Sequence, residues 1–294
     1  MEFDKKEERK RPSIKEIIAA QNFIKRRIAF ADELGGKVDD ILVEGAERIA
    51  KICLQYHIPA KDFLLKANKQ MYERITAVMD ELEDRIFQLI MNYSLHISDN
   101  DERKEGLIAY LASLGKNDMD MRETLDAYLF RYMYDIEALM ASLLLAREQG
   151  KEKALSDASI IAKVKMAQHT VYTTPEVKMA MSAKYMPTMK AQYIRLMGVH
   201  RDNTGLSTAG VSNSNANNVI NMAKNTMNMA WMKNLEMEFE QDDGIEGFFV
   251  MRGSSYPCAL CDSMVGFHPA TDSDLLPQYH AHCACIAVPM RKDE

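Results

Sequence analysis

Hydrophobic positions recur at helical spacing through most of the first 200 residues. In the segment 120–150, apolar side chains return every three or four residues until Gly150, and Asp120 with Glu123 forms the capping-box pattern that begins a helix. The segment 62–95 repeats this periodicity. At 1.5 Å per residue, each of these two helices would be about 45–50 Å long.

Shorter segments of the same kind predict further helices. They cover residues 13–34, 39–56, 102–114, 152–170 and 176–197. Helices with a single apolar stripe need partners to cover that stripe, so we expect an elongated antiparallel bundle. Nothing in this part of the chain indicates a sheet.

The pattern changes at about residue 200. Residues 201–218 are rich in Gly, Ser, Thr and Asn and indicate a boundary, after which one more helix is expected over 216–241. Short apolar runs at 245–251, 264–267 and 285–290 then predict strands. The sequence therefore predicts a mainly α protein with a helical body over 1–200 and a C-terminal domain over 201–294. The fold class is an elongated helical bundle followed by a small α+β Cys/His, zinc-type module.

The net charge and the hydropathy of the chain argue against general nucleic-acid binding and against a membrane span. Among the 294 residues, 37 Lys and Arg face 43 Asp and Glu, which gives a net charge of −6. An acidic chain is a poor general binder of nucleic acid, because phosphate contacts depend on clustered cations. The first twelve residues are charged with no apolar stretch behind them, and no apolar run is long enough to span a bilayer. We expect a protein made in the cytoplasm, without a membrane partner.

The candidate chemistry lies in a cluster of cysteines and histidines near residues 258–285. Cys258 and Cys261 form a C-x2-C pair, and the segment His280-Ala281-His282-Cys283-Ala284-Cys285 follows. Two short elements separated by 15–20 residues are typical of tetrahedral zinc, since each element supplies two ligands from one turn. The fifth cysteine, Cys53, lies in an apolar helical segment and is expected to be a core thiol.

Three ligand sets fit this spacing. The first is Cys258, Cys261, His280 and Cys283, and the second replaces the last two with His282 and Cys285. The third uses all four cysteines. The expected metal ligands are therefore drawn from Cys258, Cys261, His280, Cys283 and Cys285, with His282 as the alternative histidine.

A site closed by four protein ligands is structural, because catalytic zinc keeps one position open for water. The P-C-x-x-C string at 257–261 is also found in zinc deaminases, but these need an H-x-E motif, and no histidine here is followed two positions later by Glu. We therefore expect no catalytic residues and no enzyme. The alternative is an HNH-like, zinc-dependent nuclease or another DNA-processing enzyme that uses the Cys/His site.

Residues 218–289 resemble the Mu F-like domain of phage head-morphogenesis, or minor head, proteins. The matching parts are the helix after Asn218, the strand after Gly247, the C-x2-C pair, Val265-Gly266, Pro277, and His280 with Cys283 and Cys285. The family's closing H-P-x-C-R-C signature is altered here, because Ala281 replaces its Pro and Ala284 replaces its Arg. The resemblance covers about a quarter of the chain.

The resemblance implies a low-copy component of a tailed-phage virion. It implies a minor capsid or head-morphogenesis protein located in the virion head, and in the host cytoplasm during assembly. The expected partners are the portal protein, the major capsid protein or both, and packaged DNA and a second copy of the chain are further candidates. The expected cofactor is one structural zinc ion.

Overall fold

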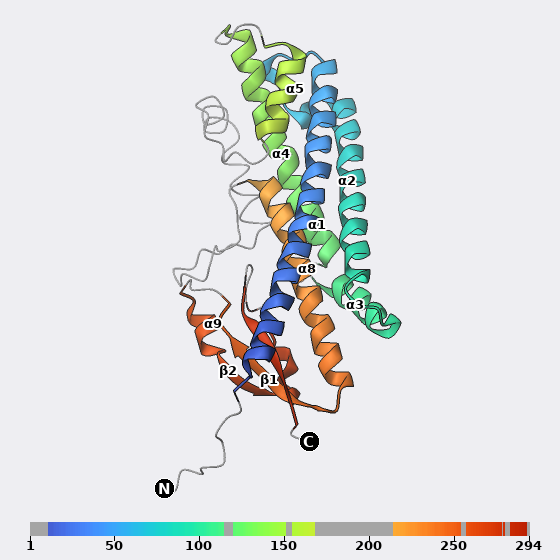
Figure 1. The fold of residues 1–294 in the computed structure, drawn as a ribbon. Coiled ribbons are helices and arrows are strands. Elements are labelled where there is room, and N and C mark those ends of the chain that lie inside the picture. Colours follow the sequence, from blue (N-terminus) through green and yellow to red (C-terminus); the bar gives the residue numbers. More distant parts are fainter. Residues whose placement is uncertain are drawn as a thin grey trace. The chain divides into compact units, whose positions relative to one another are not determined.

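The computed structural model describes residues 11–114, 120–150, 155–167, 214–253, 257–277, 279 and 283–292 (Figure 1). As the sequence predicts, these residues are mainly helical, with a small antiparallel sheet towards the C-terminus. The helices of the first part are α1 (Ile14–Gln55), α2 (Lys69–Leu95), α3 (Asp101–Ser113), α4 (Met121–Glu148) and α5 (Asp157–Met166). After α8 (Asn215–Gln241) come β1 (Ile245–Met251), α9 (Ala259–Ser263), β2 (Gly266–Pro269), the 3-10 helix η5 (Ala270–Leu275) and β3 (Ile286–Arg291).

Local signals locate the ends of several helices. The Asp120 side chain accepts a hydrogen bond from the backbone of Glu123 at 2.8 Å, and the Glu123 carboxylate accepts one from the backbone of Asp120 at 2.9 Å. This is the predicted capping box, and α4 begins immediately after it. The helix predicted from residue 62 begins later, at Lys69, because residues 60–67 form the two 3-10 turns η1 (Ala60–Asp62) and η2 (Leu65–Ala67).

The prediction of two separate helices over 13–34 and 39–56 is wrong, because α1 is continuous from Ile14 to Gln55. The predicted break falls on the pair Gly35-Gly36, and both residues are helical. A Cβ atom on Gly35 would stand only 2.8 Å from Cδ of Lys224 in α8. Gly35 is therefore explained by the close approach of a neighbouring helix.

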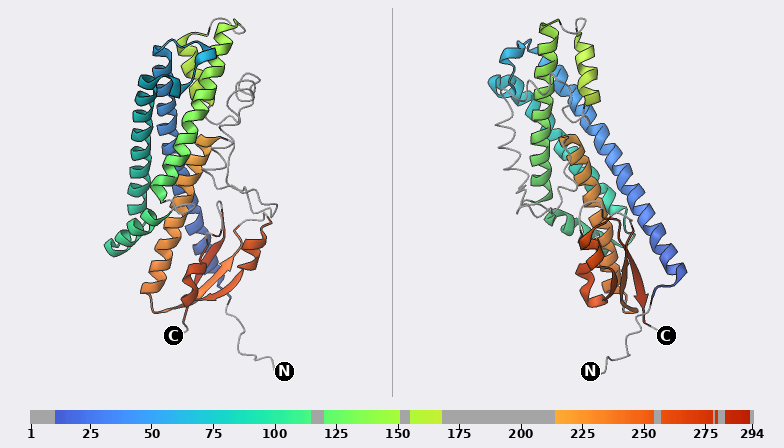
Figure 2. Two further views of the ribbon diagram at one scale, coloured as in Figure 1. Left: turned by 180° about the vertical axis from the view of Figure 1, so that it is seen from behind. Right: turned by 90° about the vertical axis from the view of Figure 1, so that its left-hand side faces the viewer.

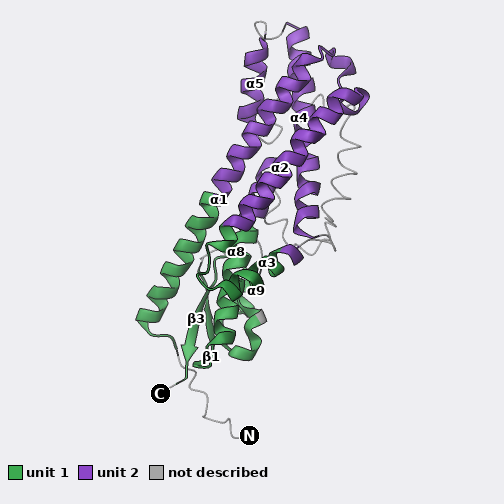
Figure 3. Cartoon of the chain, turned by 90° about the vertical axis from the view of Figure 1, so that its right-hand side faces the viewer, with its two compact units in different colours: residues 1–33, 93–111, 225–294 green, residues 34–92, 112–224 purple. Residues whose placement is uncertain are grey.

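The chain forms two compact units, and each is assembled from segments far apart in sequence (Figure 3). Unit 1 contains residues 1–33, 93–111 and 225–294, and unit 2 contains residues 34–92 and 112–224. Both α1 and α8 contribute one part to each unit. The domain boundary predicted at residue 200 and the helix predicted over 176–197 lie outside the described residues.

Unit 2 is a helical unit that contains most of α1, α2, α4 and α5. Its core is apolar and includes Leu42, Ile49, Leu82 and Ile86. The buried Tyr132 of α4 donates its hydroxyl hydrogen to the backbone carbonyl of Leu42 at 2.7 Å. That bond satisfies a polar group that would be costly to bury unpaired.

Unit 1 is built around the three-stranded sheet, whose strand order is β2-β1-β3 with both pairings antiparallel. Successive side chains in a strand point to opposite faces, and here both faces are covered. One face, with Phe248, Val250 and Ala287, packs against Met232 and Phe239 of α8. The other face, with Ile286, Val288 and Met290, packs against Ala20 and Ile24 of α1. Figure 2 shows the sheet between these two helical segments.

None of the helices in the described ranges is both long enough and apolar enough to cross a lipid bilayer.

Candidate metal centre

The first pair of cysteines is positioned by the short helix α9. Cys258 is the residue before its first turn and accepts a hydrogen bond on its backbone oxygen from Asp262 at 2.9 Å, while Cys261 is buried within the helix. Arg252, one residue after β1, contacts the carboxylate of Asp262 and donates to the backbone carbonyl of Cys258 at 3.5 Å. These contacts attach the C-x2-C turn to the end of the central strand.

The second pair of cysteines immediately precedes β3. The sheet register pairs Met251 with Ile286, so Cys285 and Gly253 lie at the same end of the sheet. The backbones are very close there, because a Cβ atom on Gly253 would lie 1.6 Å from the carbonyl oxygen of Ala284. Cys283 and Cys285 immediately precede the strand, and side chains two positions apart in extended backbone face the same side, so both thiols can point to one centre.

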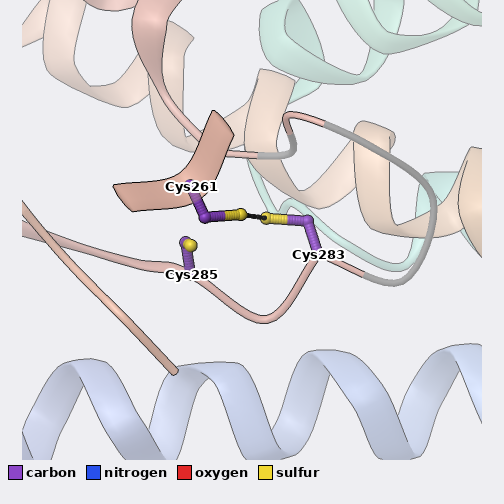
Figure 4. Close-up of side chains that lie close together, drawn as sticks. All are labelled: Cys261, Cys283 and Cys285. Carbon is purple, nitrogen blue, oxygen red and sulfur yellow. Dashed lines mark hydrogen bonds between the residues drawn. The ribbon is translucent and has the colours of Figure 1, made fainter. Parts of the chain in front are cut away.

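Three thiols converge between these segments (Figure 4). The sulfur atoms of Cys261, Cys283 and Cys285 all lie within 4.8 Å of one another, and the Cys261 and Cys283 sulfurs are 3.9 Å apart. Tetrahedral zinc with bonds of about 2.3 Å to sulfur places its thiolates about 3.8 Å apart. All five cysteines are free thiols. The arrangement is therefore close enough to bind a metal ion.

Burial makes the thiols of Cys261 and Cys285 hard to ionise without a cation. It raises the pKa of Cys261, and the neighbouring thiols of Cys285 and Cys258 raise it further. Burial also raises the pKa of Cys285, although a hydrogen bond from the Gly253 backbone acts in the opposite direction. A bound metal ion reverses this balance, because it stabilises the thiolate directly.

Cys258 differs from the other three because it is only partly buried. Hydrogen bonds from the backbone and then the side chain of Cys261 lower its pKa. A sulfur that already accepts backbone hydrogen bonds is prepared to carry negative charge. Cys258 is therefore the described residue best placed to add a fourth thiolate beside Cys261.

Arg27 of α1 reaches this centre from the other end of the chain. It is fully buried, and its Nη2 donates to the carbonyl oxygen of Cys283 at 3.1 Å. Burial lowers its pKa, and the thiols of Cys283 and Cys285 oppose this effect. Arg27 was not among the predicted site residues, since nothing near position 27 in the sequence indicates a partner 256 residues away.

The predicted ligands are only partly located. The structure brings Cys261, Cys283 and Cys285 together, whereas Cys258 lies outside this group of three, at the residue that precedes α9. His280 and His282 lie outside the described residues. The three convergent thiols all belong to the all-cysteine set. Cys53 lies in the core, where burial raises the pKa of its thiol to about 12, as expected of a core thiol.

Other polar groups close to the sheet have structural roles. The ring of His268 stacks on Phe248 with centroids 5.3 Å apart, and its Nε2 lies 2.9 Å from the carbonyl oxygen of Met264. Tyr279 donates its hydroxyl hydrogen to the carbonyl oxygen of Leu275 at 2.9 Å. Within the described part of the chain, no second group of three or more His, Cys, Asp or Glu side chains is close enough to hold a metal ion.

Comparisons with known proteins found no similar protein. No family model matches the chain, and neither the curated proteins nor the solved structures include a match.

Proposed function

We propose that the chain is a non-enzymatic structural component of a tailed-phage head whose C-terminal module is closed by one zinc ion. The metal assignment rests on the convergence of three buried sulfurs within 4.8 Å of one another, one pair of which is 3.9 Å apart, close to the separation of zinc-bound thiolates. Zinc is the preferred ion, because thiolate-rich tetrahedral sites select it over harder cations.

In this proposal Cys258 supplies the fourth ligand, and His280 and His282 are the alternatives. Cys258 is favoured because it begins the C-x2-C turn of α9 that carries Cys261. Four protein ligands leave no position for water or substrate, so the metal would hold α9 against the segment before β3. The centre would then supply folding free energy rather than catalysis.

The assignment to a phage head is supported by the resemblance of residues 218–289 to the Mu F-like domain. The protein would act as a minor capsid or head-morphogenesis protein associated with the portal. Its partners would be the portal protein, the major capsid protein or both. A buried, thiolate-rich centre favours such a structural role over a nuclease, which needs a solvent-reachable metal or histidine.

Two measurements test the proposal. Elemental analysis of protein purified without chelators should give about one zinc per chain. Expression together with the neighbouring head genes should recover the chain bound to the portal or capsid protein, and the purified chain should not cleave DNA with Mg²⁺, Mn²⁺ or Zn²⁺. DNA cleavage that is lost in His280→Ala or His282→Ala would establish the nuclease instead. A folded, metal-free protein would remove the zinc centre.

A further inference from the structure

Arg27 is an unusual residue to find inside unit 1. Among the described residues it is the largest fully buried side chain, and Nη2 of its guanidinium donates a hydrogen bond to the carbonyl oxygen of Cys283. Its Nε and Nη1 atoms have no hydrogen-bond partner among the described residues. A guanidinium carries five N–H donors and stays protonated, so it remains a cation with unsatisfied donors.

The surroundings of Arg27 do not supply an obvious counter-ion. The preceding turns of α1 place Ala20 and Ile24 in an apolar cluster with β3. Within the described ranges, the groups that act electrostatically in favour of its charge are the thiols of Cys283 and Cys285, and no carboxylate is among them. An uncompensated buried cation costs several kcal/mol. Reduced, protonated thiols would leave that cost in place.

A metal–thiolate centre would remove this cost. One Zn²⁺ with four thiolates carries a net charge of −2, and with three thiolates and a neutral histidine it carries −1. Either centre is an anion, and thiolate sulfurs accept hydrogen bonds from buried N–H groups. The charge and the free donors of Arg27 therefore match what the filled centre would present.

We propose that Arg27 is the counter-ion of a metal–thiolate centre at Cys261, Cys283 and Cys285. Arg27 is a positioning residue, and its role rests on the metal binding proposed above. Because Arg27 belongs to α1, metal binding would hold the first part of that helix on the C-terminal sheet. By linkage, the fixed helix would in turn raise the affinity for the metal.

Titration with Co²⁺ tests this proposal, since thiolate-bound Co²⁺ has visible and near-ultraviolet absorption bands. Arg27→Met removes the charge and puts an apolar side chain in its place. Arg27→Lys keeps the charge but loses the planar guanidinium with its several N–H donors. Arg26→Met is the matched control, because Arg26 is the adjacent residue and is exposed. Competition with a chromophoric chelator gives the affinity of each variant for Co²⁺ and Zn²⁺.

Arg27→Met should bind both ions about 10–100-fold more weakly, the usual effect of removing a group that supports metal ligands. Arg27→Lys should lie between it and the wild type, and Arg26→Met should match the wild type. Without metal, Arg27→Met should be at least as resistant to urea as the wild type, since it removes an unpaired buried cation. This second measurement separates a lost counter-ion from a misfolded protein.

Amide hydrogen exchange provides an independent readout. Metal should slow exchange in residues 14–33 of the wild type much more than in Arg27→Met, with residues 34–55 of the same helix as the internal reference. If Arg27→Met binds metal as tightly as the wild type, the counter-ion role is wrong while the zinc centre stands. If the wild type binds neither ion, both proposals fall.

Discussion

Gly253 and Ala284 approach so closely that a Cβ atom at position 253 would lie 1.6 Å from the Ala284 carbonyl oxygen. This contact holds the end of β1 against the segment that carries Cys283 and Cys285. Gly253→Ala cannot fit without moving one of the two backbones. Overpacking of this kind costs about 1–3 kcal/mol.

We therefore expect Gly253→Ala to lower the melting temperature and to make the buried cysteines react with a thiol reagent. Differential scanning fluorimetry and titration with an aromatic disulfide measure the two effects. The control is Gly36→Ala, where an added Cβ meets no atom within 4 Å and should stabilise the exposed helical position. A Gly253→Ala variant with wild-type melting temperature and unreactive thiols would contradict this account.

Single substitutions of the candidate ligands distinguish the three ligand sets. In the all-cysteine set, each Cys→Ser change at Cys258, Cys261, Cys283 and Cys285 removes most of the bound zinc, whereas His280→Ala and His282→Ala retain it. Elemental analysis after gel filtration gives the metal content per chain. Cys53→Ala is the control and should keep the metal, because Cys53 lies in unit 2.

The opposite pattern would identify another set. Loss of zinc in His280→Ala with retention in Cys285→Ser would assign the first set, with His280 and Cys283 as ligands. Loss in His282→Ala with retention in Cys283→Ser would assign the second. Retention of zinc in all of the cysteine variants would exclude all three sets.

The capping box of α4 should make a measurable contribution to stability. Asp120→Ala removes the acceptor for the Glu123 backbone N–H and should lower the free energy of unfolding by about 1 kcal/mol. Asp120→Asn keeps an N-cap acceptor and should lose much less. Urea denaturation followed by circular dichroism measures both variants. Equal stability of Asp120→Ala and the wild type would show that the cap does not matter for the folded chain.

Two bidentate ion pairs link α1 to α2 in unit 2. Arg48 donates to Glu81 at 2.7 and 2.6 Å, and Arg85 donates to Glu44 at 3.0 and 2.8 Å. The hydrogen bond from Arg85 and the charges of Arg85 and Arg48 lower the pKa of Glu44. The carboxylates are about half exposed, so Glu44→Gln should cost less than about 1 kcal/mol at neutral pH, and less still in high salt.

The pH dependence of this effect has a definite sign. A lowered pKa of Glu44 in the folded state means that the unfolded state binds more protons. The stabilisation by the ion pair of Glu44 is therefore fully present above the ordinary glutamate pKa of about 4.3. It is lost as the pH falls through the lower folded pKa. The stability difference between the wild type and Glu44→Gln should therefore shrink below about pH 4, whereas a difference independent of pH would contradict the ion pair.

Much of the helical fold could be predicted because its signals are local. The capping box at Asp120 and the periodicity of 216–241 depend on short stretches of sequence, and α4 and α8 begin and end within two residues of the predicted limits. The short strands were also predictable, since apolar runs between turn residues precede and follow the cysteine segment. In each case neighbouring residues determine the structure.

The errors and omissions have a common physical cause, because they depend on distant parts of the chain. Gly35 and Gly36 resemble a helix stop, but α1 is continuous through them, and side chains of α8 pack against Gly35. Arg26 and Arg27 are the same residue type, and helical spacing puts Arg27 on the buried stripe with Ile24 and Ala31, but it does not reveal the contact with Cys283. For the candidate site, spacing identified the cysteines that converge but could not indicate the helix that covers them.

Unit 1 combines segments that lie far apart in the sequence, and this has a consequence for its folding during biosynthesis. Residues 14–33 are made long before their partners in β3, since 256 residues separate Arg27 from Cys283. At about 5–20 residues per second, a ribosome needs on the order of 10–50 s to cover that distance. During this interval Ala20 and Ile24 have no strand to cover them. Unit 1 can therefore be completed only after β3 has been synthesised, and the nascent chain must keep this part of α1 from aggregating until then.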